Sequence, residues 1–235
     1  MNLETSIRLL SGEGVWTTQP VPEIGLRAMT LSDGPVGVRG GTDTELDPAA
    51  VLPTGSAMAA SWDEDLLHRI GGVLAGEAVR KGVDVVLGPT INLHRSPRGG
   101  RHFECFSEDP LLSGRLATAY VRGVQENGVG ACPKHYIAND AETDRTTVDN
   151  QVDERTLREL YLAPFEAVVA DARPWMIMAA YNGVNGAPMT ENDLLAEPLK
   201  GEWGFDGPLT LATGPSAGAV HVSATVPITP EGTLA

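Results

Sequence analysis

Cysteine is scarce in this sequence, which contains only Cys105 and Cys132. Two cysteines without the paired spacing of a metal-binding motif give neither a disulfide framework nor a metal site, and they fit a reducing compartment. We therefore interpret both as packing residues. His94 and His102 form no metal-ligand pattern with their neighbours. We expect neither a metal ion nor any other cofactor.

Basic residues are also few, with 17 Lys and Arg against 31 Asp and Glu and a formal net charge of -14. Nucleic acids and anionic membrane surfaces are both polyanions, so this charge argues against either one as a partner. It does not bear on the binding of a neutral molecule.

Long apolar runs are missing, and none approaches the length that crosses a bilayer. The first residues lack the basic start and the apolar segment of a signal peptide. We therefore expect a cytoplasmic, soluble protein with no membrane contact. A chain of 235 residues is long enough for one sizeable core and one or two domains.

Short apolar runs alternate with longer segments of helical spacing, which is typical of βα units around a parallel sheet. The predicted strands cover residues 26–31, 83–89, 131–137, 175–181 and 207–212, and the predicted helices cover 63–81, 111–128 and 153–172. We expect Ser61 to cap the first helix, with Glu64 three residues later, and Asn127-Gly128 to end the second.

Polar side chains follow the predicted strands, and in a parallel barrel the chemistry collects where strands end. They are Asp33, Asn92, Arg95, Arg98, Arg101, Lys134, His135, Arg145, Tyr181 and Asn182. One polar strand end, such as Lys134-His135, is by itself best explained as a solvated loop. Several strand ends of this kind in succession favour a polar pocket instead.

Nine segments between residues 29 and 207 occur in the order and at the intervals of one family. They are residues 29–39, 52–54, 59–63, 88–92, 97–104, 107–110, 134–136, 178–182 and 203–207. Together they resemble glycoside hydrolase family 3, the β-glucosidase-type enzymes. The resemblance covers roughly residues 10 to 207.

The resemblance implies the α/β class and a (β/α)8 TIM-barrel-like fold, incomplete because its last strands and helices are missing. We expect residues 1–207 to form this partial domain. Its pocket would hold the non-reducing end of a β-glucoside or a related oligosaccharide.

Site residues follow from the resemblance position by position. Asp33 would accept hydrogen bonds from the hydroxyls at carbons 4 and 6. Arg101, Lys134 and His135 would hold those at carbons 3 and 4, Arg145 the one at carbon 2, and Tyr181 would lie near the anomeric carbon. Charge-assisted hydrogen bonds suit closely spaced sugar hydroxyls.

A purely structural alternative stays open for the two arginines, because Arg101 and Arg145 could instead form ion pairs with Glu104 and Glu142. We interpret residues 107–110 as a turn that shapes a loop rather than as a catalytic carboxylate pair.

The family pattern breaks at the nucleophile. A retaining glycosidase needs two carboxylates that flank the scissile bond. The nucleophile's position falls near Ala212, which cannot attack, and no later segment supplies the acid/base Glu. Asp206 precedes the last predicted strand, so we place it at the opposite end of the sheet from the pocket.

Composition changes at the same point, since Glu231 is the only charged residue after Asp206 and Lys200 is the last Lys or Arg. Residues 208–235 are of low complexity, and we predict that they are disordered. One explanation is a frameshift, because codons for Ala212-Thr213-Gly214 can hide Asp-Trp in another frame. The other is a terminus that has diverged.

Three functions remain open. The first is a β-glucosidase-like hydrolase by family that is inactive as this chain. The second is a non-catalytic sugar-binding or regulatory pseudoenzyme. The third is a relative that cuts N-acetylhexosaminides, and the Asp33-Gly34-Pro35 segment fits that branch poorly.

Overall fold

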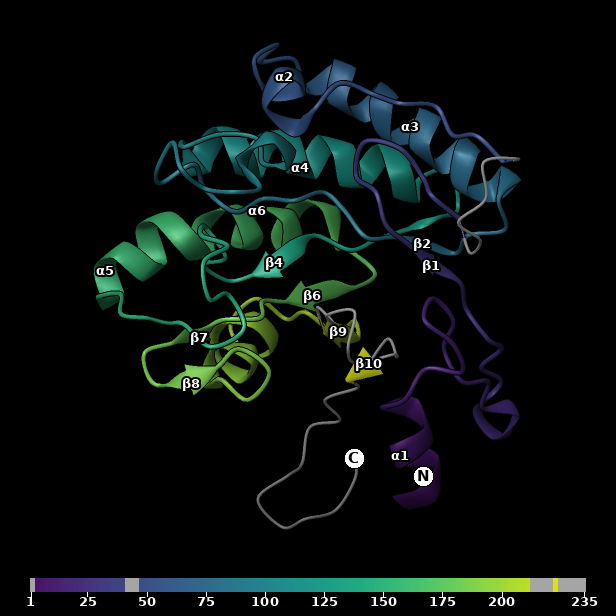
Figure 1. Ribbon diagram of the computed structural model, residues 1–235. Helices are drawn as coiled ribbons and strands as arrows, with labels where there is room; N and C mark the ends of the chain where they lie inside the picture. The colour runs from purple at the N-terminus through teal and green to yellow at the C-terminus, as the bar shows by residue number, and fades with distance from the viewer. Residues whose placement is uncertain (1–2, 41–46, 212–221, 224–235) are drawn as a thin grey trace.

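The computed structural model describes residues 3–40, 47–211 and 222–223 (Figure 1). Its helices are α1 (Leu3–Leu9), α2 (Gly55–Ala59), α3 (Glu64–Arg80), α4 (Pro110–Gln125), α5 (Glu154–Thr156) and α6 (Ala163–Ala172). Short 3-10 turns are η1 (Pro22–Ile24), η2 (His102–Glu104) and η4 (Asp193–Leu195), and π-helical turns are η3 (Leu157–Leu162) and η5 (Ala196–Lys200). Ala212 and most of the tail predicted to be disordered lie outside the described residues, but residues 209–211 and 222–223 of that tail form strands.

The strands form three small sheets. They are β1 (Leu31–Ser32), β2 (Val85–Val86), β3 (Gly130–Ala131), β4 (Lys134–Tyr136), β5 (Asp149–Asn150), β6 (Ile177–Ala179), β7 (Gly183–Val184), β8 (Ala187–Pro188), β9 (Leu209–Leu211) and β10 (Val222–Ser223).

Parallel strands follow one another in chain order, as the sequence predicted. β1, β2 and β3 pair in parallel, and so do β4, β6 and β9, while a parallel bridge between Thr90 and Lys134 connects the two groups. The α/β class is therefore confirmed. Closure into an eight-stranded barrel is not established, because among the described residues the sheets are small and open and β10 pairs antiparallel with β9.

Two predicted strands need correction. The first was placed too early, because the backbone at Met29 and Thr30 pairs with Thr17 and Thr18 of the N-terminal segment, so β1 begins at Leu31. The predicted strand 131–137 is split into β3 and β4. Pro133 lies at the break, and a proline has no amide hydrogen to give to the ladder.

Helices α3, α4 and α6 form a layer over the parallel strands (Figure 1). Helix α3 begins one residue after Asp63, whose carboxylate accepts a hydrogen bond from the Leu66 amide at 2.9 Å. The predicted Ser61 cap is therefore wrong, because Ser61 accepts only from the Asp63 amide. Gly123 of α4 packs so closely on α3 that a Cβ there would clash with the His68 carbonyl oxygen.

The predicted helix 153–172 is present but is not uniform. Its middle, η3, has π geometry between α5 and α6. Pro164 follows this segment and cannot donate the i→i−4 hydrogen bond that a regular α-helix requires there.

The sequence prediction missed a third sheet, β5-β7-β8. Strands β7 and β8 form a tight antiparallel hairpin whose two turn residues, Asn185 and Gly186, both have positive φ. Asn-Gly is the sequence that such a turn favours, so a signal for this hairpin was present.

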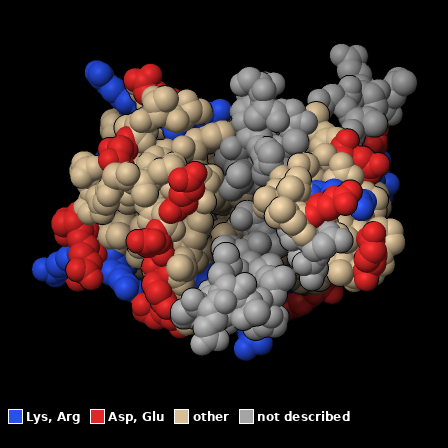
Figure 2. All heavy atoms as spheres, turned by 90° about the horizontal axis from the view of Figure 1, so that it is seen from below, with Lys and Arg blue, Asp and Glu red and all other residues tan. Residues whose placement is uncertain are grey.

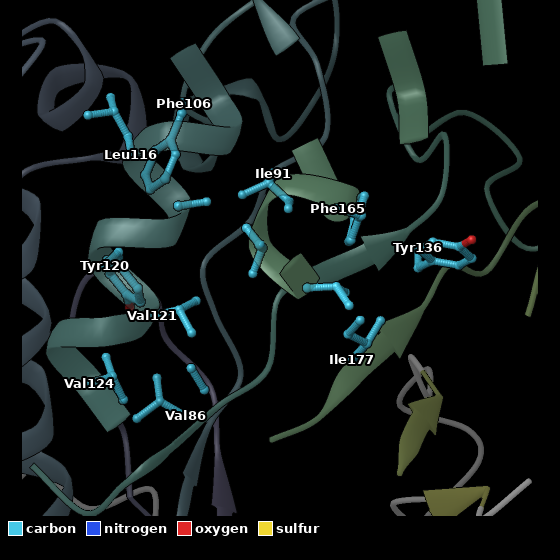
Figure 3. Packing of buried hydrophobic residues seen from close by; sticks show 14 of the residues in the cluster. Val86, Ile91, Phe106, Leu116, Tyr120, Val121, Val124, Tyr136, Phe165 and Ile177 are labelled. Atoms are coloured by element: carbon cyan, nitrogen blue, oxygen red, sulfur yellow. The ribbon is translucent and has the colours of Figure 1, made fainter. Parts of the chain in front are cut away.

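The larger apolar core lies between the helical layer and the strands. Figure 3 shows Leu116, Tyr120 and Val121 of α4 on one side, with Tyr136 and Ile177 of neighbouring strands on the other. The Tyr136 and Phe165 rings meet edge to face, with centroids 5.2 Å apart. Cys105 and Cys132 are buried and unpaired, in line with the packing role expected of them. The strands packed against this core carry the polar residues at their ends.

Candidate functional site

Four separate stretches of sequence supply the six predicted site residues. Asp33 directly follows β1, Lys134 and His135 are on β4, and Tyr181 lies two residues after β6. Arg101 immediately precedes η2, and Arg145 lies in the connection between β4 and β5. Contacts between side chains join the six residues in pairs.

The first pair is an ion pair between Asp33 and Lys134. The Lys134 ammonium lies 2.7 Å from Asp33 Oδ1, and the side chains are 3% and 34% exposed, respectively. Burial raises the pKa of Asp33, but the Lys134 ammonium, helped by Arg39 and Arg101, outweighs this effect and leaves the pKa below its usual value. Asp33 therefore has a buried cation as its partner, and its carboxylate stays ionised.

His135 is buried between Arg101 and Asn92. Its Nε2 lies 3.3 Å from Arg101 Nη1, and its Nδ1 lies 3.0 Å from Asn92 Oδ1. Burial lowers the pKa of His135 well below 6.5, and the cations Lys134, Arg101 and Arg145 lower it further. The imidazole is therefore neutral at neutral pH.

Each arginine also forms the structural ion pair that the sequence left open. Arg101 donates from Nε to Glu104 Oε1 at 2.7 Å and from Nη2 to Oε2 at 3.0 Å. Arg145 donates to Glu142 Oε2 at 2.5 Å. These carboxylates fix the guanidinium planes and leave Arg101 Nη1 turned toward His135.

Tyr181 is placed by Arg145, whose guanidinium carbon lies 4.6 Å from the centre of the ring. Burial raises the pKa of Tyr181, although Arg145 and Arg101 act in the opposite direction. The phenol thus remains protonated and can donate a hydrogen bond.

Two hollows border these residues. One is small, and Arg101, His135, Asn92, Asn139 and Glu142 are among the residues that line it. The other, about 200 Å³, lies against Tyr181 and the loop residues Thr146 and Thr147. Three of the six predicted residues therefore line these hollows, Arg101 and His135 the first and Tyr181 the second.

The residues that support the site were only partly predicted. Asn92 was recognised as a polar strand end but was not included among the sugar-binding residues, although it bonds His135 at three atoms. Asn139, which donates to Glu142 at 3.0 Å, was not among the predicted site residues. The three-residue spacing of Arg101 and Glu104, and of Glu142 and Arg145, was the signal for the ion pairs.

Acidic side chains are more prominent than basic ones on the face shown in Figure 2, in keeping with the net charge of -14. Within the described part of the chain, no group of three or more His, Cys, Asp or Glu side chains is arranged to hold a metal ion. No helix among those residues is long and apolar enough to cross a membrane.

Comparison with known proteins identifies the family. The model of the glycosyl hydrolase family 3 N-terminal domain matches residues 19–212, which is most of the chain. The chain belongs to glycosyl hydrolase family 3. The resemblance inferred from the sequence motifs is thereby confirmed.

Curated relatives of this family 3 chain are β-glucosidases. Beta-glucosidase B of Emericella nidulans is 49% identical over 208 residues, which are 88% of this chain and 25% of that protein. Thermostable beta-glucosidase B of Acetivibrio thermocellus is 47% identical over 215 residues, 88% of this chain and 28% of that protein. The chain thus spans about a quarter of the length of these relatives.

Solved structures give the same assignment. Beta-glucosidase 3B from Thermotoga neapolitana, in complex with alpha-D-glucose, superposes with a TM-score of 0.84 at 41% identity. The match covers 90% of this chain and 32% of that one. Beta-glucosidase from Kluyveromyces marxianus in complex with glucose gives a TM-score of 0.86 at 40% identity, over 90% and 26% of the two chains.

Proposed function

We propose that this chain forms the part of a β-glucosidase-type site that grips one glucose ring, and that the chain as it stands binds the sugar without cleaving its glycosidic bond. The single observation that carries the proposal is the set of three contacts, Asp33–Lys134, Arg101–His135 and Arg145–Tyr181. They gather charged and polar groups from four distant stretches of sequence.

The chemistry of the six side chains suits a polyhydroxylated ring. Lys134, Arg101 and Arg145 offer only donors, the ionised Asp33 offers only acceptors, and Tyr181 can do both. Each sugar hydroxyl can donate and accept at once, so it can bridge an acceptor and a cation of this set. Related family 3 enzymes have been solved with glucose bound, which supports this class of ligand.

Individual roles follow the family pattern. We assign Asp33 to the hydroxyls at carbons 4 and 6, and Lys134, Arg101 and His135 to those at carbons 3 and 4. Arg145 would hold the hydroxyl at carbon 2, with Tyr181 beneath the anomeric carbon. In this arrangement the glycosidic bond of a β-glucoside points away from Asp33.

Hydrolysis needs a nucleophile that this chain does not supply. The nucleophile's position falls near Ala212, and a methyl group cannot form the covalent intermediate. Asp206 is an unsuitable replacement, because it is exposed and precedes β9, whereas Tyr181 follows the parallel strand β6 at its other end. Glu104 and Glu142 are each held by an arginine.

A second candidate function is a sugar-binding or regulatory pseudoenzyme. It is favoured by the same combination of an assembled polar site and an absent nucleophile. It differs from an inactive fragment of a hydrolase in what the gene encodes, so the nucleotide sequence around codon 212 and beyond separates the two.

Two assays on the purified chain test the proposal. Glucose should bind saturably, and an aryl β-glucoside should not be hydrolysed above the rate of the buffer control. Ala212→Asp should not restore hydrolysis, because a retaining mechanism needs a second carboxylate, and Glu104 and Glu142 are each held by an arginine. Turnover of the aryl glucoside that Asp33→Ala abolishes would show that the nucleophile has been misplaced.

A further inference from the structure

The side-chain amide of Asn92 contacts three atoms of His135. Asn92 Nδ2 donates to the His135 carbonyl oxygen at 2.9 Å, and Asn92 Oδ1 accepts from the His135 amide at 3.0 Å. The same Oδ1 lies 3.0 Å from Nδ1 of the His135 ring. Asn92 and His135 are 4% and 3% exposed, so water does not compete freely for these bonds.

The two backbone bonds fix which end of the Asn92 amide is oxygen. A carbonyl oxygen can only accept and a backbone N–H can only donate. In a flipped amide, the Asn92 oxygen would face the His135 carbonyl oxygen and the Asn92 NH2 group would face the His135 N–H, so neither hydrogen bond could form. The atom beside the ring Nδ1 of His135 is therefore an acceptor.

The protonation of the ring follows from its neighbours on both sides. Because Asn92 Oδ1 only accepts, Nδ1 must carry the proton. On the other side, the Arg101 guanidinium only donates, and its Nη1 lies 3.3 Å from Nε2, so Nε2 must present its lone pair. Two independent partners thus require the same form of the ring.

We propose that Asn92 is a positioning residue that holds His135 as the neutral tautomer protonated at Nδ1, so that Nε2 faces the ligand as a hydrogen-bond acceptor. For the ligand, this inference rests on the proposed function. Lys134 and Arg101 can only donate to a sugar hydroxyl, so His135 supplies the acceptor that takes that hydroxyl's own proton. The glucose hydroxyl at carbon 3 is the one that we assign to it.

Arg101 can make way for a hydrogen bond between the sugar hydroxyl and His135 Nε2. Its contact with Nε2 is long, and its Nε and Nη2 stay anchored on Glu104 at 2.7 and 3.0 Å. A hydroxyl can therefore replace Nη1 at the ring without releasing the guanidinium.

The charges around the ring favour the neutral form. The cations Lys134, Arg101 and Arg145 surround His135 and oppose a further positive charge. Carboxylates also line the adjoining hollow. Of these, Glu142 is bound to Arg145 and Asp140 to the Leu93 amide, and Glu104, behind Arg101, is bound to that arginine.

Nitrogen NMR on the ligand-free chain with labelled histidine tests the tautomer directly. The chain has five histidines, and the His135 signals are those that vanish in His135→Gln. We expect the shift of a protonated nitrogen at Nδ1 and of a bare nitrogen at Nε2, unchanged from about pH 5 to about pH 8. A proton on Nε2, or a ring that titrates within this range, would overturn the proposal.

Variants assign the effect to Asn92. Asn92→Leu removes the acceptor and should let the two tautomers interconvert, which averages the two nitrogen shifts. Asn92→Asp keeps an acceptor but adds an anion, so Nδ1 should stay protonated while the ring pKa rises. The matched control is Asn192→Leu, because Asn192 is a buried amide that bonds the carbonyls of Val184 and Ala187. It should leave the His135 signals unchanged.

Should Asn92→Leu fail to fold, the wild-type spectrum and Asn92→Asp decide the matter. An Asn92→Asp spectrum identical to wild type at every pH would exclude the positioning role.

A fluorinated sugar tests the acceptor role. Fluorine at carbon 3 cannot donate, so 3-deoxy-3-fluoro-D-glucose should bind roughly tenfold more weakly than glucose, the value of about one hydrogen bond. Equal binding of both sugars would refute the acceptor role. If the tautomer is as expected but glucose does not bind at all, the proposed function fails while the assignment of the ring stands.

Discussion

Asn in place of Asp33 should destabilise the folded chain far more than a comparable change on the surface. The Lys134 ammonium is 3% exposed, and among the described side chains Asp33 is its ion-pair partner, at 2.7 Å. Removing the negative charge leaves a buried cation without its counter-ion. Such losses cost about 3–5 kcal/mol when both partners are buried.

The expected size is smaller here because Asp33 is 34% exposed and water can reach its position. Asn also keeps one oxygen that can accept from Lys134. We therefore expect a loss of about 2–3 kcal/mol in the free energy of unfolding. Lys134→Met, which removes the buried cation itself, should cost about 1 kcal/mol, and the double variant about the same as Lys134→Met alone.

The assay is urea unfolding followed by circular dichroism, with Glu159→Gln as the matched control. Glu159 pairs with Arg155 at 2.9 Å, but their side chains are 60% and 82% exposed, so the control should lose at most about 0.5 kcal/mol. If Asp33→Asn costs no more than Glu159→Gln, or if the double variant equals the sum of the single ones, the ion pair does not carry the energy argued here.

Three further predictions concern pH and packing. Asp33 has a folded pKa below the unfolded value of 3.8, so its stabilisation is present above about pH 4 and is lost as the pH falls through the folded pKa. Urea midpoints in acid should therefore fall further in the wild type than in Asp33→Asn. Burial raises the pKa of Asp140 to about 6, against 3.8 unfolded, so its folded form keeps a proton that the unfolded chain releases. Stability should decline as the pH rises from about 4 to about 6, and Asp140→Asn should flatten that decline, whereas an unchanged pH profile would exclude this cause. Gly123→Ala should lower the free energy of unfolding by about 2–3 kcal/mol, because the new methyl meets the backbone of α3. Gly76→Ala, on the open face of α3, should raise it by about 0.5–1 kcal/mol. Equal thermal shifts for these two variants would contradict the close packing of α3 on α4.

The sequence predicted the features that depend on local pattern. Helical spacing of apolar residues located α3 and α4 within a few residues, because burial of one face requires that spacing. The six site residues were predicted because they match positions of the family motifs. Their pairwise contacts could not be derived from local pattern, because the side chains of Asp33 and Lys134 meet only after β1 and β4 have taken their places in the fold.

The failures have physical causes too. We predicted β3 and β4 as one strand, because the sequence does not show that the two segments pair with different partners, β2 and β6. Asp63, rather than Ser61, caps α3 because its carboxylate reaches the Leu66 amide, a choice that depends on where the first turn begins. Asn92 went unrecognised as a site residue because a buried amide near a strand end has many possible partners, and the sequence does not say which.

Glucose binding measured residue by residue tests the central claim most directly. In amide spectra of the labelled chain, added D-glucose should shift the signals of Lys134, His135 and Tyr181 along one saturable curve, and Asp33→Asn should abolish the response. Spectra that do not change at any glucose concentration, or shifts that Asp33→Asn leaves intact, would contradict the assignment of these residues to a sugar site.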